Sequence, residues 1–289
     1  MFGVALSFFV FPVLASTPPP ITGGVETDAL PAVVALVGVK PDITWDLCTA
    51  TLIDPYVALT AAHCIEGMEN ADGYDFELRV GSGLGEPDES FPLDSWIMHP
   101  DADVDMALVF LAEPALTSPL PPFAEQLAVD GPEELAKLVG YGRTSTPNKD
   151  SGVKRSVDVL VGQVDEQVIF LLDRDELLGA CSGDSGGPVL LERDGQWTPV
   201  AVMTTIFDWD GDEEACGDAT LGLLIYPHLA WIQEEVAAVQ PEPEPEGEEP
   251  QGDPPEEEGG RFGCSSVGGG SSWPLSFGVL ALLFVRRRS

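Results

Sequence analysis

Short apolar runs separated by glycine, proline and aspartate recur along the chain. Residues 32–39 and 200–205 are two such runs, and both are rich in β-branched side chains. Runs of this length and composition favour strands, with turns at the residues that interrupt them. A different pattern occurs at 229–236, where three apolar residues follow helical spacing. The pattern therefore predicts a mainly β-sheet protein with a helix near residue 230.

The two ends of the chain differ from this globular pattern. Residues 1–16 contain the apolar run 8–11 and end in small residues, which indicates a signal peptide. Residues 17–20 would then remain as a short pro-segment before a globular domain at 21–239. Proline, glutamate and glycine dominate residues 240–260, which hold nine acidic and no basic residues. We predict a disordered acidic spacer over 240–261, because such a composition cannot bury a core, and a separate C-terminal tail at 262–289.

The most informative motif is residues 181–188, which read CSGDSGGP. A serine hydroxyl becomes a nucleophile only when a base removes its proton and donors hold the oxyanion that follows. Glycine permits the tight turn that would point the N–H groups of Gly183 and Ser185 at one spot beside the Ser185 hydroxyl. The motif predicts a nucleophilic serine with its oxyanion hole; a turn without a catalytic purpose is the alternative.

Three histidines are present, so the candidates for the base are few. His63 follows the end of an apolar run and precedes a cysteine, in the motif AAHC at 61–64. His99 and His228 each adjoin a proline, and we interpret both as surface or capping residues. His63 is therefore the predicted general base.

The acid that orients this base is expected in an otherwise apolar strand. Residues 104–111 form such a run and contain Asp105. Burying a carboxylate is costly without a partner, and an imidazole is a suitable partner. Asp101 and Asp103 lie nearby, and we interpret them as solvated loop residues. The predicted triad is His63, Asp105 and Ser185.

These motifs resemble those of the trypsin-like (chymotrypsin-fold) serine endopeptidases. AAHC at 61–64, DMAL at 105–108 and GDSGGP at 183–188 occur in the family's order, and ITGG at 21–24 and GYG at 140–142 resemble two further family segments. The resemblance covers about residues 21–239. It implies an all-β fold of two packed six-stranded antiparallel β-barrels with a short C-terminal helix, and a triad in the cleft between the barrels.

The resemblance also implies an activation step. Asp184 would form an ion pair with the α-amino group of Ile21 once the bond before Ile21 is cut. Relatives usually carry Arg or Lys before this bond, whereas Pro20 stands there in this chain. Self-activation by a trypsin-like cut is therefore not expected. Either another peptidase removes the residues before Ile21, or the ion pair is not made.

Alignment with the family assigns the substrate pocket to Gly179, Ala180, Thr204, Ile206 and Thr220. Gly179 stands where trypsin-type enzymes carry an aspartate, so a basic substrate side chain would be left unpaired. The side chains of Ile206 and Thr220 would make the substrate pocket narrower. The resemblance therefore implies a preference for small aliphatic residues before the scissile bond.

Five cysteines are present. The resemblance pairs Cys48 with Cys64 and Cys181 with Cys216. Each bridge would contribute roughly 2–4 kcal/mol of stability, and two disulfides indicate an oxidising compartment. Cys264 is left without a partner in this scheme.

The surroundings of Cys264 resemble the MYXO-CTERM type of C-terminal sorting tail, which myxosortase processes in certain Gram-negative bacteria. Cys264, an apolar segment at 275–285 and three arginines at 286–288 carry the resemblance. It implies cleavage near Cys264 and attachment to the cell surface. An ordinary membrane anchor is the alternative, although the apolar segment is shorter than the about 20 residues that a spanning helix needs.

The formal net charge is −36, and residues 21–239 contain 40 acidic against 9 basic residues. Such a surface excludes nucleic acid as a partner. No cofactor is expected, and no metal is predicted: the Asp-rich segment 208–214 offers oxygen ligands but does not fit the helix-loop-helix calcium pattern. The sequence predicts an exported, surface-anchored, monomeric serine endopeptidase with a polypeptide substrate and a sorting enzyme that acts on its tail. A non-catalytic homologue that serves as an extracellular binding module is the alternative.

Overall fold

The computed structural model describes residues 21, 24–41, 43–128, 134–145, 149–172, 178–207, 216 and 219–239. The chain divides into two units, Met1–Glu242 and Pro243–Ser289, and every described residue belongs to the first. The predicted signal peptide, pro-segment, spacer and C-terminal tail, with Cys264, lie outside the described residues, as does the segment 208–214. Among the described residues, none of the helices has the length and apolar character needed to cross a membrane.

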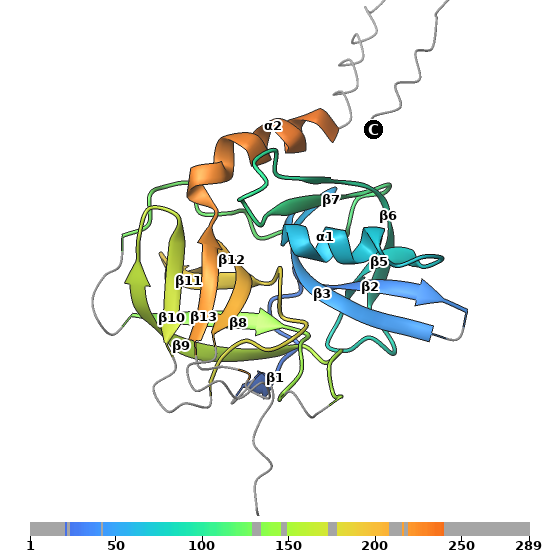
Figure 1. Ribbon diagram of the computed structural model, residues 1–289, viewed down its shortest axis with the longest axis horizontal. Coiled ribbons are helices and arrows are strands. Elements are labelled where there is room, and N and C mark those ends of the chain that lie inside the picture. The colour runs from blue at the N-terminus through green and yellow to red at the C-terminus, as the bar shows by residue number, and fades with distance from the viewer. Residues whose placement is uncertain are drawn as a thin grey trace, which may run out of the picture. The chain divides into compact units, whose positions relative to one another are not determined.

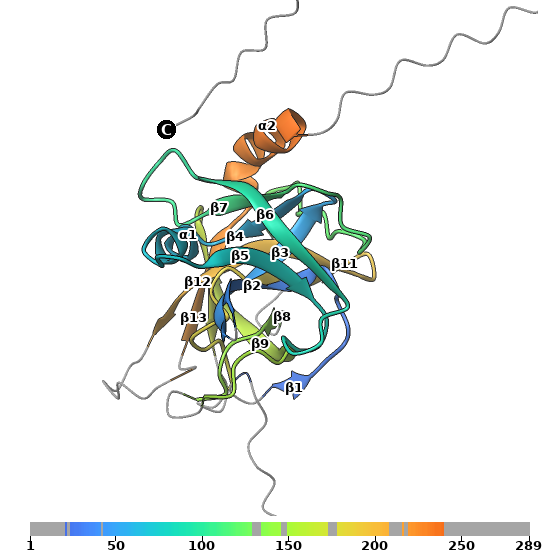
Figure 2. The same ribbon diagram turned by 90° about the vertical axis from the view of Figure 1, so that its right-hand side faces the viewer.

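Six antiparallel strands close into a first barrel in the order β2-β3-β4-β7-β6-β5 (Figures 1 and 2). They are β2 Val33–Lys40, β3 Ile43–Asp54, β4 Val57–Thr60, β5 Asp75–Val80, β6 Glu89–Met98 and β7 Ala107–Leu111. Every residue of β4 and β7 is buried. Closure pairs each strand on both sides, so the barrel exposes no strand edge.

Six further strands form a second barrel: β8 Leu135–Gly140, β9 Arg155–Val164, β10 Val168–Leu172, β11 Pro188–Arg193, β12 Gln196–Phe207 and β13 Ala219–Leu224. They follow the order β9-β10-β13-β12-β11-β8, and the pairing of β8 with β9 closes the ring. β1 Val25–Glu26 adds to the outside of β9. The two six-stranded antiparallel barrels confirm the predicted fold.

Helix α2, Leu229–Val239, is the predicted C-terminal helix (Figure 1). A 3-10 turn, Tyr226–His228, leads into it directly from the second barrel. Ile232 of α2 is nevertheless buried in the core of the first barrel. The chain therefore leaves the second barrel and packs its last apolar helix against the first, which ties the two together.

His228 was interpreted as a surface or capping residue, and the surface alternative was wrong. Its side chain is buried, its ring packs edge-on against His99, and His99 packs in turn against Trp231. Nε2 of His228 has no hydrogen-bond partner among the described residues. The sequence pattern could not show that His228 is buried, because the burial depends on how α2 and the residues before it pack against distant segments such as His99.

We expect the stability contribution of His228 to fall at acidic pH. Burial, and then the nearby His99, lower the pKa of His228 below the usual 6.5. As the pH falls below about 6.5, the unfolded chain takes up a proton that the folded chain does not, so folding is progressively disfavoured. Urea unfolding from pH 7.5 to 5 should show a smaller loss of stability for His228→Phe than for the wild type. Parallel curves would contradict this account.

Candidate active site

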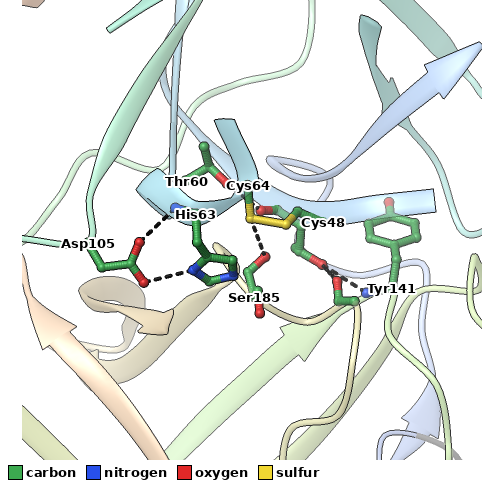
Figure 3. The surroundings of a disulfide bond; sticks show 9 residues. Cys48, Thr60, His63, Cys64, Asp105, Tyr141 and Ser185 are labelled. Carbon is green, nitrogen blue, oxygen red and sulfur yellow. Dashed lines mark hydrogen bonds and ion pairs between the residues drawn. A yellow bond between two sulfur atoms is a disulfide. The ribbon is translucent and has the colours of Figure 1, made fainter. Parts of the chain in front are cut away.

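Residues from both barrels meet at one place (Figure 3). His63 and Asp105 belong to the first barrel, and Ser185 belongs to the loop that leads into β11 of the second. The Thr49 backbone N–H of β3 donates to the Ser185 carbonyl at 2.9 Å. The site is thus held across the boundary between the barrels.

His63 lies in the first turn of α1, Ala62–Glu69, which begins shortly after β4 ends at Thr60. Asp105 lies two residues before β7, and not within an apolar strand as predicted. Its carboxylate accepts one hydrogen bond from the His63 backbone N–H at 2.9 Å and another from Nδ1 at 2.8 Å. The first bond satisfies a backbone donor at the start of α1, where Ala61 offers no side-chain cap. Asp101 and Asp103 are exposed, as expected.

The two groups shift each other's pKa in opposite directions. The hydrogen bond with Asp105 raises the pKa of His63 against the effect of burial. Burial alone would raise the pKa of Asp105, but the hydrogen bonds from the His63 ring and from the backbone N–H groups of His63 and Ala62 outweigh it, and the pKa is lowered. Asp105 is therefore ionised near neutral pH and holds the proton on Nδ1, which leaves Nε2 of neutral His63 as an acceptor.

Ser185 stands beside the His63 ring, on the side away from Asp105 (Figure 3). Its loop is held by hydrogen bonds from the Asp184 N–H to the Cys181 carbonyl at 3.0 Å and from the Gly187 N–H to the Asp184 carbonyl at 2.9 Å. No hydrogen bond joins the Ser185 hydroxyl to His63 among the described residues. Such contacts are often long without substrate.

The surroundings of Gly186 explain why the GDSGGP motif has a glycine at this position. Its φ is +81°, in the left-handed region, and a Cβ there would overlap the Thr60 hydroxyl and the Thr49 carbonyl. Only glycine fits a backbone that approaches the first barrel this closely.

The peptide group between Ser182 and Gly183 has a fixed direction. The Arg143 N–H donates to the Ser182 carbonyl at 3.0 Å. Because a trans peptide points its C=O and N–H in opposite directions, the Gly183 N–H faces away from Arg143. Within the described part of the chain, no acceptor receives the N–H of Gly183 or of Ser185. Both groups are available to an incoming oxyanion.

Asp184 is fully buried beneath this loop. Its carboxylate accepts hydrogen bonds from the N–H groups of Gly142 and Cys181, each at 2.8 Å. Burial raises its pKa to about 7, and these bonds oppose the increase. A Cβ at Gly140 or Gly142 would overlap the carboxylate, which explains both glycines of the GYG motif.

The Ile21 nitrogen lies in a peptide bond with Pro20 in this chain, so no α-amino group is present to pair with Asp184. The Ile21 side chain is buried in the second barrel's core, in the same cluster as Ala180. Its φ is +42°, an unfavourable value for a β-branched residue that costs on the order of 1–3 kcal/mol. A cut before Ile21 would remove this backbone constraint.

The structure brings together three of the five predicted pocket residues. Ile206 and Thr220 are direct partners across β12 and β13. The Thr220 hydroxyl is buried and accepts a hydrogen bond from the Ala180 N–H at 3.2 Å. Gly179 is buried next to Ala180, and the Thr204 hydroxyl donates to the Leu221 carbonyl at 3.5 Å.

Two disulfides join Cys48 to Cys64 and Cys181 to Cys216, which are the expected pairs. Among the described residues, the one grouping of possible metal ligands is Cys48, His63 and Cys64. Both cysteines are in the disulfide, so this grouping does not offer thiolates to a metal.

Sequence reasoning missed Thr49, which is fully buried. Its hydroxyl donates to the Gly183 carbonyl at 2.9 Å and accepts from the Tyr141 N–H at 3.1 Å. Thr49 therefore links the first barrel to both loops around the nucleophile. Its only signal in the sequence is its place next to Cys48.

Comparison with known proteins agrees with this geometry. The family model described as Trypsin matches residues 21–218. Vitamin K-dependent protein C from Mus musculus and from Oryctolagus cuniculus are each 27% identical to the chain, over 221 and 233 residues. These matches cover 64% and 68% of the chain but 45% and 48% of the relatives, so the chain spans about half the length of the curated relatives it matches. Because the family match covers more than half of the chain, the protein belongs to the trypsin family.

Proposed function

We propose that the protein is a serine endopeptidase in which His63, Asp105 and Ser185 form the catalytic triad. The observation that carries the proposal is the pair of hydrogen bonds from His63 to Asp105, with Ser185 on the opposite side of the ring (Figure 3). A binding module would have no need for an oriented imidazole beside a serine hydroxyl.

The mechanism follows from these positions. His63 Nε2 takes the proton from Ser185 as the serine oxygen bonds to the scissile carbonyl carbon, and the N–H groups of Gly183 and Ser185 stabilise the oxyanion. When the intermediate collapses, the C–N bond breaks and the imidazolium gives its proton to the leaving amine. Water then attacks the acyl-enzyme, with His63 again as the base. Asp105 keeps the ring in the required tautomer and stabilises its charged form.

The proposed role of His63 predicts the pH dependence of the reaction. The base must be neutral, and the hydrogen bond with Asp105 raises its pKa. We expect kcat/KM for a short ester substrate to rise with pH, with its midpoint above the 6.5 of an ordinary histidine. Asp105→Asn should lower this midpoint, because the carboxylate that favours the imidazolium is removed. A pH-independent rate from pH 5 to 8 would contradict the role of His63.

The pocket supports small aliphatic residues before the scissile bond. Thr220 occupies space beside Ala180, and Ile206 stands opposite Thr220. We expect Ile206→Gly to increase kcat/KM for phenylalanine relative to alanine at this position by about tenfold or more, since hydrophobic pockets discriminate by 10–200-fold. Thr198→Gly is the control, because it also places a glycine in β12 but near the other end of the strand. An unchanged substrate profile of Ile206→Gly would exclude this pocket.

Export and surface attachment complete the proposal. The apolar segment within residues 1–16 and the tail around Cys264 support them, and the two disulfides fit an oxidising compartment. The protein would act as a monomer on a polypeptide substrate, held at the cell surface of a Gram-negative bacterium after a sorting enzyme has processed its tail. Mass spectrometry of the mature protein tests this, since a C-terminus near residue 264 is expected and an intact tail would favour a membrane anchor.

A further inference from the structure

Arg155 is a buried cation that the proposed mechanism does not use. It is the first residue of β9 and is only 4% exposed. Burying a charged side chain is costly unless its surroundings compensate for the lost water. A guanidinium nevertheless stays protonated at neutral pH. The groups that Arg155 contacts therefore face a full positive charge.

The guanidinium joins the two ends of the loop that follows β8. Its Nη1 donates to the carbonyl oxygens of Asp150, Gly142 and Val153, at 3.0, 3.3 and 3.4 Å. The carbonyl of Gly142 belongs to the peptide group that joins Gly142 to Arg143. The direction of this peptide group is therefore set, with its oxygen toward the guanidinium.

The same peptide group is hydrogen-bonded to the proposed oxyanion hole. Its N–H, which belongs to Arg143, donates to the Ser182 carbonyl at 3.0 Å. The N–H of that second peptide group belongs to Gly183, a proposed oxyanion donor. Because a trans peptide points its C=O and N–H in opposite directions, a hydrogen-bond path leads from Arg155 through the two peptide groups to the Gly183 N–H.

Close packing of the two loops makes this path possible. Gly183 has a φ of +101°, and a Cβ there would lie 2.9 Å from the Cα of Gly142. A side chain at position 183 would therefore push the loops apart and lengthen the hydrogen bond from Arg143 to Ser182.

The charge of Arg155 acts on the loop that carries the nucleophile. Burial raises the pKa of Asp184 to about 7, and Arg155 is one of the groups that oppose the increase. Hydrogen bonds in a row polarise one another, and a low local dielectric strengthens the effect. A cation at the carbonyl end of the path makes the N–H at the far end a stronger donor. This donor stabilises an oxyanion more than the neutral carbonyl of a bound substrate.

We infer that Arg155 is a positioning residue of the oxyanion hole, which acts on the Gly183 N–H through the two intervening peptide groups. The inference rests on the proposed function and adds to it a residue outside both the triad and the nucleophile loop. Loss of the charge would weaken one oxyanion donor without removing it, and the Ser185 N–H would remain as the other.

The test compares Arg155→Gln, which keeps an N–H donor without the charge, with Arg155→Lys, which keeps the charge. For a short ester and the full chain, we expect Arg155→Gln to lower kcat about tenfold with KM unchanged, less than the about 10²–10³-fold that follows the loss of a whole donor. Arg155→Lys should restore most of kcat. In the matching thionoester the negative charge develops on sulfur, a weak acceptor, so Arg155→Gln should reduce the ratio of ester to thionoester rates.

Arg193→Gln is the matched control. Arg193 also lies on the second barrel, where it pairs with Glu134 and donates to the carbonyls of Glu192 and Ala128 at 3.0 and 3.1 Å. None of these groups belongs to the path, so the rate ratio should not change. An equal fall of ester and thionoester rates in folded Arg155→Gln, or no fall in either, would overturn the inference.

A second pair of variants interrupts the path without altering Arg155, and it serves also if Arg155→Gln does not fold. Arg143→Pro removes the N–H that donates to Ser182, whereas Arg143→Ala keeps it. We expect the rate ratio to fall in the proline variant alone, and an equal ratio in both would contradict the inference. If the wild type does not hydrolyse the ester, the proposed function fails, and this inference fails with it.

Discussion

Replacing Ser185 by alanine should lower kcat by about a millionfold, as expected for the loss of the nucleophile of a triad that acts as a unit. His63→Ala should cost about as much, because the serine hydroxyl is a weak nucleophile without its base. Asp105→Asn should cost about 10⁴-fold, since an amide no longer holds the proton on Nδ1. Hydrolysis of a short ester, with unfolding followed in parallel, measures all three.

The free energy of unfolding of each variant is the control for the activity measurements on Ser185, His63 and Asp105. The Ser185 side chain is partly exposed and makes no hydrogen bond with the described residues, so its removal should change the free energy of unfolding by no more than about 0.5 kcal/mol. A variant that is folded and retains more than about a hundredth of the wild-type rate would exclude Ser185 as the nucleophile.

A chain that begins at Ile21 should be about 10²–10³-fold more active than one that retains residues before it. The free α-amino group would supply a cation to the buried Asp184. Among the described residues, the Asp184 carboxylate accepts hydrogen bonds only from the N–H groups of Gly142 and Cys181, and Arg155 acts on it electrostatically. That ion pair would hold the loop that carries the Gly183 N–H in the arrangement seen here, and displacing this one oxyanion donor would cost this much in rate. Ester hydrolysis by chains with and without the extension measures the effect.

Stability against pH gives an independent check on the same ion pair. In the uncut chain burial raises the pKa of Asp184 to about 7, against about 3.9 when unfolded. The folded state therefore binds a proton that the unfolded state releases, and stability falls as the pH rises from about 4 to 7, by roughly 4 kcal/mol in all. A chain that begins at Ile21 should lose much less. If both chains show the same activity and the same pH dependence, the Ile21 contact is not made.

The residues that could be predicted from the sequence are those with narrow physical requirements. Gly140, Gly142 and Gly186 stand where a Cβ would overlap a neighbouring group, so their motifs carry the backbone geometry directly. The apolar runs of strand length predicted a mainly β-sheet protein, and the two barrels were implied by the resemblance to the family. Both disulfide pairs came from that resemblance.

Other features depend on packing between distant segments. His228 is buried because α2 folds back onto the first barrel, which no local pattern shows. Thr49 links β3 to the two loops around the nucleophile through hydrogen bonds, although a threonine in a strand has no distinctive signal. A surface hollow lined by residues 43–45 and 67–74 forms from two segments that are separated in the sequence, so no local pattern shows it.

Reaction with a fluorophosphonate probe tests the central claim most directly, because the probe bonds to a serine oxygen only when a base activates it. The chain that begins at Ile21 should take up one equivalent of label at Ser185, and Ser185→Ala and His63→Ala should take up none. Folded wild-type protein with both disulfides formed that remains unlabelled would contradict the account, and the two barrels would then serve as a binding module.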